Sequence, residues 1–458
     1  MTPLLALVLA ASVDGQAALR HASALAALGP HPWGSPRNQA AAEYVAAQFR
    51  EAGLEAVELQ PFERHGVQGT NVVGTLRAPG DDFVVIGAHH DTVPQAPGAY
   101  DDGGGVGILI ELARVLAQDR QRSRTLVFAS FDGEEAESTP GRGSAAGSRA
   151  FVERLGPRAR SLVAAFAIDM SGWRGGSPTL HPIAYADPHE SDRSVIAPAW
   201  LVRAALAGAR EAGAPYAVGD PWLSWLYQPG VRTFRVRLYA DDLSFLQAGH
   251  SALFTSDSSF FAFYPDYHKP SDTADKLDAG ALERQGQSAL GVVRALERVP
   301  RGSPHEPHWF AAFGYVLGLP ALLALGALSF VPGLLRCRRA GGVAVVVRVV
   351  QALVAALLLW RQPVPALYVL LVPLLLLPLA RTWWSVLLSL LPTLALAGLG
   401  ASAWYRGVVG GLWLAPWELV LLVLALGLAF FGLGGRGSGS RSRKPKAPRT
   451  GRGARVRV

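Results

Sequence analysis

One segment of the sequence restricts the possible folds of this chain more than any other feature. Between residues 309 and 435, long apolar runs follow one another with almost no acidic side chains between them. A helix that crosses a bilayer needs roughly 20 apolar residues, and five runs come near that length. They occupy residues 309–331, 343–360, 364–379, 384–405 and 412–433. The pattern predicts an all-α transmembrane domain at residues 309–435, with about five helices in a lipid bilayer.

Basic residues predict how these helices are oriented. The loop at residues 336–339 holds three arginines, and the tail at 436–458, expected to be disordered, holds nine Lys or Arg and no acid. Short segments of this kind stay in the cytoplasm. Five crossings then place both in the cytoplasm and the residues before 309 on the non-cytoplasmic side. We therefore expect a multi-pass membrane protein. The tail alone accounts for the formal charge of +8, and a basic tail after a membrane segment usually contacts lipid, so we expect no nucleic-acid partner.

Residues 1–300 have the mixed composition of a globular protein. The opening MTPLLALVLAAS resembles the apolar core of a signal peptide, so residues 1–19 are expected to be a signal peptide or its remnant. Strand-like segments then alternate with helical ones, which is typical of α/β domains. We predict one such domain at residues 20–300, with a mixed, mostly parallel sheet and helices on both faces, and a linker at 301–308. Strands are expected at 71–76, 83–86, 125–131 and 161–168, and helices at 36–53 and 104–116.

Five segments place His, Asp or Glu mostly just after apolar strands. In α/β sheets, ligands bind beyond the carboxyl ends of the strands. Cys337 is the single cysteine, so a transition metal in this chain would depend on His, Asp and Glu ligands. The segments are GAHHDTV, GAYDDGGGVG, FDGEEAE, AIDMSG and YHKPSDTADKLD.

Taken alone, each segment also has an ordinary structural explanation. Two acids before a glycine-rich helix start suit the helix dipole, and adjacent glutamates are common in exposed turns. An imidazole followed two residues later by an acid is more informative. His89 and Asp91 point the same way on an extended chain, and a carboxylate there can fix the second ring nitrogen of a metal-binding histidine. Asp169 ends an apolar strand, where a buried acid is costly unless it is paired or metal-bound.

In this order, the segments resemble the two-zinc aminopeptidase family of clan MH, which includes bacterial leucyl aminopeptidases, glutaminyl cyclases and multi-spanning endoplasmic-reticulum metallopeptidases. The resemblance covers nearly all of residues 20–300 and implies the zinc-exopeptidase fold and two zinc ions. It also implies a cis peptide between Asp101 and Asp102. The roles that it implies are His89 and Asp169 on one zinc, Glu135 and His268 on the other, Asp101 bridging both, Glu134 as general base and acid, and Asp91 as partner of His89.

The resemblance implies an aminopeptidase that removes N-terminal residues from peptides, and it leaves other functions open. The first is a glutaminyl-cyclase-like acyltransferase, the second a non-catalytic, receptor-like ectodomain, and the third a transporter with a peptidase appendage. The presence of all five ligands and the base favours hydrolysis. Two features depart from the family: the segment AESTPGRGSAA is long, and Tyr239, the candidate to assist the oxyanion, does not match the expected spacing.

Overall fold

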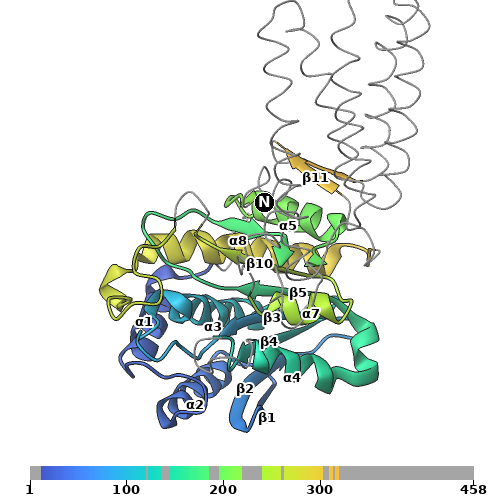
Figure 1. Ribbon diagram of the computed structural model, residues 1–458. Coiled ribbons are helices and arrows are strands. Elements are labelled where there is room, and N and C mark those ends of the chain that lie inside the picture. Colours follow the sequence, from blue (N-terminus) through green and yellow to red (C-terminus); the bar gives the residue numbers. More distant parts are fainter. Residues whose placement is uncertain are drawn as a thin grey trace, which may run out of the picture. The chain divides into compact units, whose positions relative to one another are not determined.

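The computed structural model describes part of the chain, which Figure 1 draws in colour. The described residues are 12–119, 122–135, 145–184, 195–218, 240–258, 263–302, 309–312 and 315–318. The chain divides into two compact units, Met1–Ala324 and Leu325–Val458, and every described residue lies in the first. Among the described residues, no helix is both long enough and apolar enough to cross a membrane. The apolar start of the chain, Tyr239 and the expected transmembrane helices beyond residue 318 lie outside the described residues.

A mixed sheet of eight strands forms the centre of the domain, in the order β1-β2-β4-β3-β5-β10-β6-β9. The strands β4, β3, β5 and β10 run parallel to one another, whereas β1 and β2 form an antiparallel hairpin and β6 is antiparallel to β10. Every residue of β3, β4 and β5 is buried, as expected for parallel strands covered on both faces. The bounds are β1 Ala56–Arg64, β2 Val67–Leu76, β3 Phe83–His89, β4 Thr125–Phe131, β5 Leu162–Ile168, β6 Thr179–His181, β9 Ala217–Val218 and β10 Ala252–Ser256.

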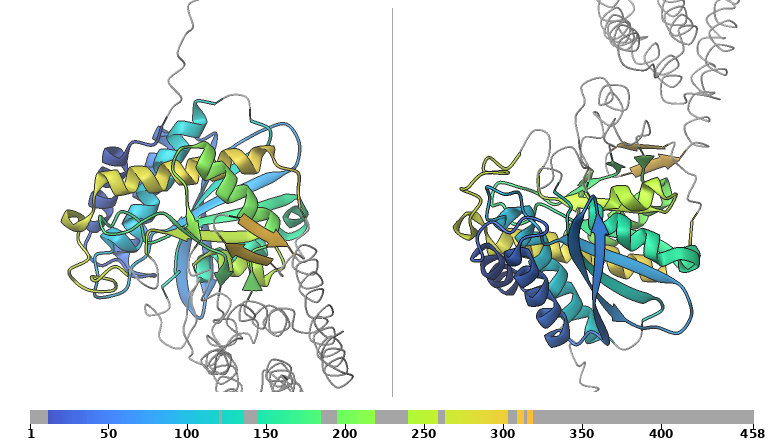
Figure 2. Two further views of the ribbon diagram at one scale, coloured as in Figure 1. Left: turned by 90° about the horizontal axis from the view of Figure 1, so that it is seen from above. Right: turned by 60° about the horizontal axis from the view of Figure 1, so that its bottom comes forward.

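Helices cover both faces of this sheet, which confirms the predicted α/β architecture (Figure 2). Alternate residues of β3 divide between two hydrophobic cores. Val84 and Ile86 pack with the helices α1, α2, α3, α5 and α8, whereas Phe83 and Val85 pack with α4 and α7. The bounds are α1 Gly15–Ala26, α2 Pro36–Glu51, α3 Gly104–Ala117, α4 Ala146–Leu155, α5 Ala199–Glu211, α7 Asp242–Gln247 and α8 Ala279–Arg298.

Side-chain caps explain where several of these helices begin. Ser35 accepts a hydrogen bond from the N–H of Asn38, and Pro36 occupies the first turn of α2. Asp14 and Asp278 cap α1 and α8 in the same way. Such caps satisfy backbone donors that have no partner within the helix. The helix predicted at residues 36–53 therefore starts as expected and ends two residues early.

The remaining elements are short. They are η1 Ala99–Gly103, η3 Gly156–Ser161, η4 Ala274–Lys276, and the paired strands β7 Ile183–Ala184 and β8 Val195–Ile196. A further antiparallel pair, β11 Trp309–Ala312 and β12 Tyr315–Gly318, lies where the first predicted transmembrane helix was expected to begin. At these residues the structure differs from the prediction. Aromatic residues and Val316 favour an extended backbone in this segment.

Candidate metal centre

The predicted site residues follow the carboxyl ends of neighbouring parallel strands. His89 is the last residue of β3 and pairs in register with Phe131, the last residue of β4. Glu134 and Glu135 follow β4, and Asp169 follows β5 on the other side of β3. Parallel neighbours end at one edge of a sheet, so these four side chains meet there. Asp101 and His268 reach the same edge from η1 and from the segment before η4.

The carboxylate of Asp101 lies between two imidazoles. Its Oδ1 is 3.2 Å from His89 Nε2, and its Oδ2 is 3.2 Å from His268 Nε2. The same ring nitrogen of each histidine also faces a second carboxylate. Asp169 Oδ1 is 3.7 Å from His89 Nε2, and Glu135 Oε2 is 3.2 Å from His268 Nε2. The structure therefore brings together all five predicted ligands, and Asp101 directs one oxygen to each of the two histidines.

Asp101 and Asp102 are joined by a cis peptide bond, as the family resemblance implied. Asp102 also lies close enough to His89 and Asp169 to hold a metal with them. However, Asp102 Oδ1 accepts the N–H of Gly105 at 2.9 Å and Oδ2 accepts the N–H of His89 at 3.3 Å. Because backbone donors already use both oxygens, the geometry favours Asp101 as the ligand and Asp102 as a support for His89.

The donor set fits a divalent transition metal. Nitrogen and oxygen atoms from His and carboxylates are the ligands that zinc takes when thiolates are absent. Glu135 Oε1 and Asp169 Oδ1 are buried and have no hydrogen-bond partner, and buried carboxylates are costly unless a cation or donors compensate them. In the part of the chain described, His89 and His268 are the only basic side chains within ion-pair distance of Asp101, Glu135 and Asp169.

Asp91 connects His89 with the turn that carries Glu134 and Glu135. Its Oδ1 lies 3.4 Å from His89 Nδ1 and accepts the N–H of Glu134 at 3.0 Å, while its Oδ2 accepts the N–H of Glu135 at 3.1 Å. Burial alone would raise the pKa of Asp91, but His89 and the N–H of Glu134 bring it below its usual value. The contact with His89 was expected from the sequence. The contacts that orient the Glu134–Glu135 turn were not.

Glu134 has the environment of a proton acceptor. Its carboxyl group is buried, and burial together with the charges of Glu135, Asp169 and Asp241 raises its pKa well above the usual value, although His89 acts in the opposite direction. A general base works best when its pKa lies near the working pH. A bound cation beside Glu134 would lower this pKa again, because a positive charge favours the carboxylate.

Tyr267 belongs to the same site and was missed from the sequence. Its ring stacks on the imidazole of His268, with centroids 3.7 Å apart and planes at 18°. Burial raises the pKa of Tyr267 well above its usual value, and the negative charges of Asp101 and Glu135 raise it further. The available signal was its position directly before a predicted metal ligand in DYHKP.

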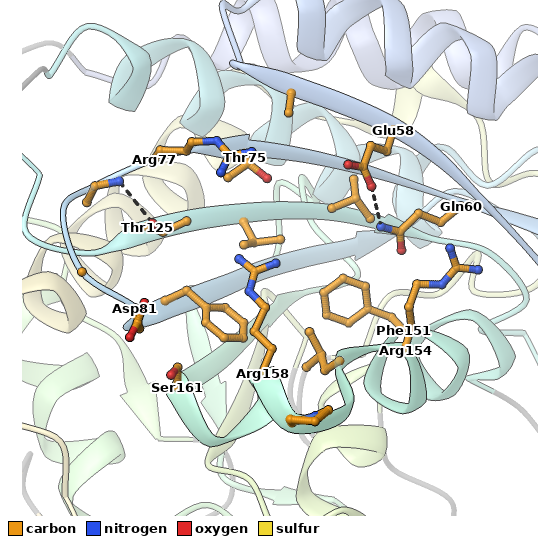
Figure 3. Close-up of a pocket in the computed structure, with 18 residues that line it drawn as sticks. Glu58, Gln60, Thr75, Arg77, Asp81, Thr125, Phe151, Arg154, Arg158 and Ser161 are labelled. Carbon is orange, nitrogen blue, oxygen red and sulfur yellow. Dashed lines mark hydrogen bonds between the residues drawn. The ribbon is translucent and has the colours of Figure 1, made fainter.

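A large cavity lies between the strands β1 to β4 and the segment of α4 and η3 (Figure 3). Its volume is about 650 Å³, and Phe83, the first residue of β3, is among the residues that line it. The side chains of Arg154 and Arg158 rise toward the strands from α4 and η3, and the Arg158 guanidinium lies 4.7 Å from the centre of the Phe83 ring. None of the site residues named above lines this cavity, so it is separate from the candidate metal centre.

Comparisons with known proteins agree with this site. Residues 71–293 match the model of peptidase family M28. Leucine aminopeptidase 1 of Metarhizium robertsii is 26% identical over 276 residues, which cover 58% of this chain and 64% of that protein. The vacuolar membrane protease of Laccaria bicolor is 34% identical over 133 residues, 26% of this chain and 13% of that protein. The chain thus spans less than two thirds of the length of either relative.

A solved structure shows the same fold. The zinc aminopeptidase of Bacillus subtilis superposes with a TM-score of 0.50 and 15% sequence identity, covering 64% of this chain and 98% of that one. The segment that matches the family model begins at Asn71 in β2 and ends within α8, so it contains each of the predicted site residues. Across residues 71–293, the chain therefore matches peptidase family M28.

Proposed function

We propose that residues 20–300 form an aminopeptidase with two zinc ions, which removes N-terminal residues from peptides. One observation carries the proposal. The two oxygens of Asp101 face His89 and His268, each at 3.2 Å, with a further carboxylate beside each imidazole. His89 and Asp169 would hold one zinc, Glu135 and His268 the other, and Asp101 both. Zinc bound at such a site activates a water molecule and polarises the carbonyl group of the substrate.

The chain's own residues then carry the proton transfers. Glu134 accepts the proton from the attacking water and returns it to the leaving amine, which is the role of a general base that becomes a general acid. Asp91 holds His89 and the N–H groups of Glu134 and Glu135, so that base and ligands keep one relative position. Tyr267, whose ring stacks on His268, is a second candidate hydrogen-bond donor to the substrate oxygen beside Tyr239.

The completeness of the site also separates the proposal from its rivals. A glutaminyl cyclase acts with one metal, and a receptor-like ectodomain needs neither the ligands nor the base. In this chain both halves of the ligand set and Glu134 converge in one cluster, in which only His268 is partly exposed. A cluster of uncompensated buried carboxylates is costly to keep, which favours the hydrolytic function that uses all of them.

A substrate panel tests this assignment on the full-length chain. We expect zinc-dependent release of naphthylamine from aminoacyl-naphthylamides and no release from the same compounds after N-acetylation, because an aminopeptidase requires a free amino terminus. A peptide that begins with glutamine should be shortened by one residue. Conversion of that glutamine to a pyroglutamyl end, without any hydrolysis, would instead favour the cyclase.

We further propose that the chain is a multi-pass membrane protein with its peptidase domain outside the cytoplasm. The arginines at residues 336–339 and the basic tail at 436–458 support this orientation, and the name of the Laccaria bicolor relative also refers to a membrane. A reporter that fluoresces only in the cytoplasm should be bright when fused after Ala340 and after Val458. A dark fusion after Val458 beside a bright one after Ala340 would mean an even number of crossings.

A further inference from the structure

Asp272 is a fully buried acid four residues after His268 and is not one of the five candidate ligands. Its carboxylate accepts three hydrogen bonds. Oδ1 accepts the N–H of Tyr100 at 2.9 Å and the hydroxyl of Tyr264 at 3.2 Å, and Oδ2 accepts the N–H of Asp101 at 3.3 Å. None of these donors carries a charge, so among the described contacts the carboxyl group of Asp272 is held by neutral donors alone.

Three consecutive backbone N–H groups are donated to this single residue. In addition to the two bonds to its carboxylate, the carbonyl oxygen of Asp272 accepts the N–H of Ala99 at 3.3 Å. The segment that enters the Asp101–Asp102 cis peptide is therefore fixed by Asp272 at three successive positions. The regular i→i−4 pattern of an α-helix cannot provide these bonds here, because Asp101 has φ −120° and ψ 89°.

This arrangement connects two candidate ligands that are 167 positions apart in the sequence. Asp272 and His268 belong to one loop, whose Asp272 N–H bonds to the carbonyl oxygen of Lys269 at 3.0 Å. Packing reinforces the connection, because the rings of Tyr100 and Tyr264 have centroids only 4.1 Å apart. Because Asp272 binds the backbone of Asp101, its loop holds the imidazole of His268 beside the carboxylate of Asp101.

We propose that Asp272 is a positioning residue that sets Asp101 against His268, and so determines the affinity of the metal held by Asp101, Glu135 and His268. The inference rests on the proposed function, because it takes these three residues as ligands. The pair formed by His89 and Asp169 depends less on Asp272, since both residues are placed by the ends of β3 and β5. Loss of Asp272 should therefore weaken one metal more than the other.

The variant Asp272→Asn tests this with little change in volume. An amide keeps one acceptor oxygen but turns an N–H donor toward the N–H of either Tyr100 or Asp101, so one of the two bonds must break. We expect one zinc ion to bind about 10–100-fold more weakly, the usual effect of losing a group that orients a ligand, while the other changes little. Competition of the metal-free, full-length chain against a chromophoric zinc chelator measures both dissociation constants. The thermal midpoint of the metal-free protein is recorded in parallel.

Asp275→Asn is the matched control, because Asp275 is an exposed acid in the same loop and accepts only from Thr273 among the described contacts. It should bind both zinc ions as the wild type does. If Asp272→Asn does not fold, Tyr264→Phe removes one donor to Asp272 and keeps the ring contact with Tyr100. A smaller shift is then expected in the same dissociation constant.

The outcomes separate this inference from the proposed function. Selective weakening of one zinc supports the positioning role, whether or not the wild type hydrolyses peptides. Two results would overturn the inference and leave the proposed function intact. One is unchanged zinc dissociation constants in Asp272→Asn. The other is equally weaker binding of both zinc ions together with a lower thermal midpoint of the metal-free protein. A wild-type chain that binds no zinc would overturn both.

Discussion

Replacing Glu134 by Gln is expected to lower kcat by ~10²–10⁴-fold, as the loss of a general base does, and to leave both zinc ions bound. Glutamine has nearly the same shape as glutamate but cannot accept the proton of the attacking water. The N–H of residue 134 still bonds to Asp91, because that contact uses the backbone. The turn should therefore keep its conformation, and Glu135 should keep its place as a ligand.

The measurement pairs steady-state kinetics with zinc content on the same preparation. Glu153→Gln serves as the control, since Glu153 is an exposed glutamate of α4 that pairs with Arg64 at the surface. It should retain wild-type kcat. Near-normal turnover in Glu134→Gln with two zinc ions bound would show that another group acts as the base.

Replacing Asp101 by Ala is expected to have the largest effect on the metals. Its two oxygens face the two imidazoles, so its loss removes one ligand from each ion at once. Both zinc ions should bind more weakly, and activity at micromolar zinc should disappear. By contrast, Asp169→Ala should weaken mainly the zinc beside His89, because its contact lies on that side alone.

Zinc titrations of the two variants give the comparison directly. Asp81→Ala is a suitable control, since Asp81 is an exposed acid at the opposite edge of the sheet. Selective loss of one ion in Asp101→Ala, with the second bound as in the wild type, would contradict the bridging role.

The local sequence was sufficient to predict the centre of the fold. The apolar runs of β4 and β5 lie within one residue of their predicted ranges, because strands buried on both faces carry an uninterrupted apolar signal. The strand β1 was missed, since its residues are mostly exposed or half-buried and include Pro61. Proline is tolerated at the edge of a sheet, where its missing N–H faces solvent, but it weakens the strand signal in the sequence.

The candidate site was predictable only in part, for a different reason. Residue types and their order identified the ligands through a family resemblance, and the parallel strands explain why the ligands meet. The groups that support the ligands left no comparable signal. Asp91 acts on backbone N–H groups 43 and 44 positions away, and Asp272 acts on groups more than 170 positions away. Such contacts depend on how loops approach each other in space.

The most direct test of the central claim is a zinc titration of the metal-free, full-length chain, with bound metal and aminopeptidase activity measured in the same samples. Hydrolysis of an aminoacyl-naphthylamide should be absent without metal and return as zinc is added, and bound zinc should reach two ions per chain at saturation. Full activity after complete removal of the metal, or activity with no zinc bound at saturation, would contradict the proposal of a zinc-dependent aminopeptidase.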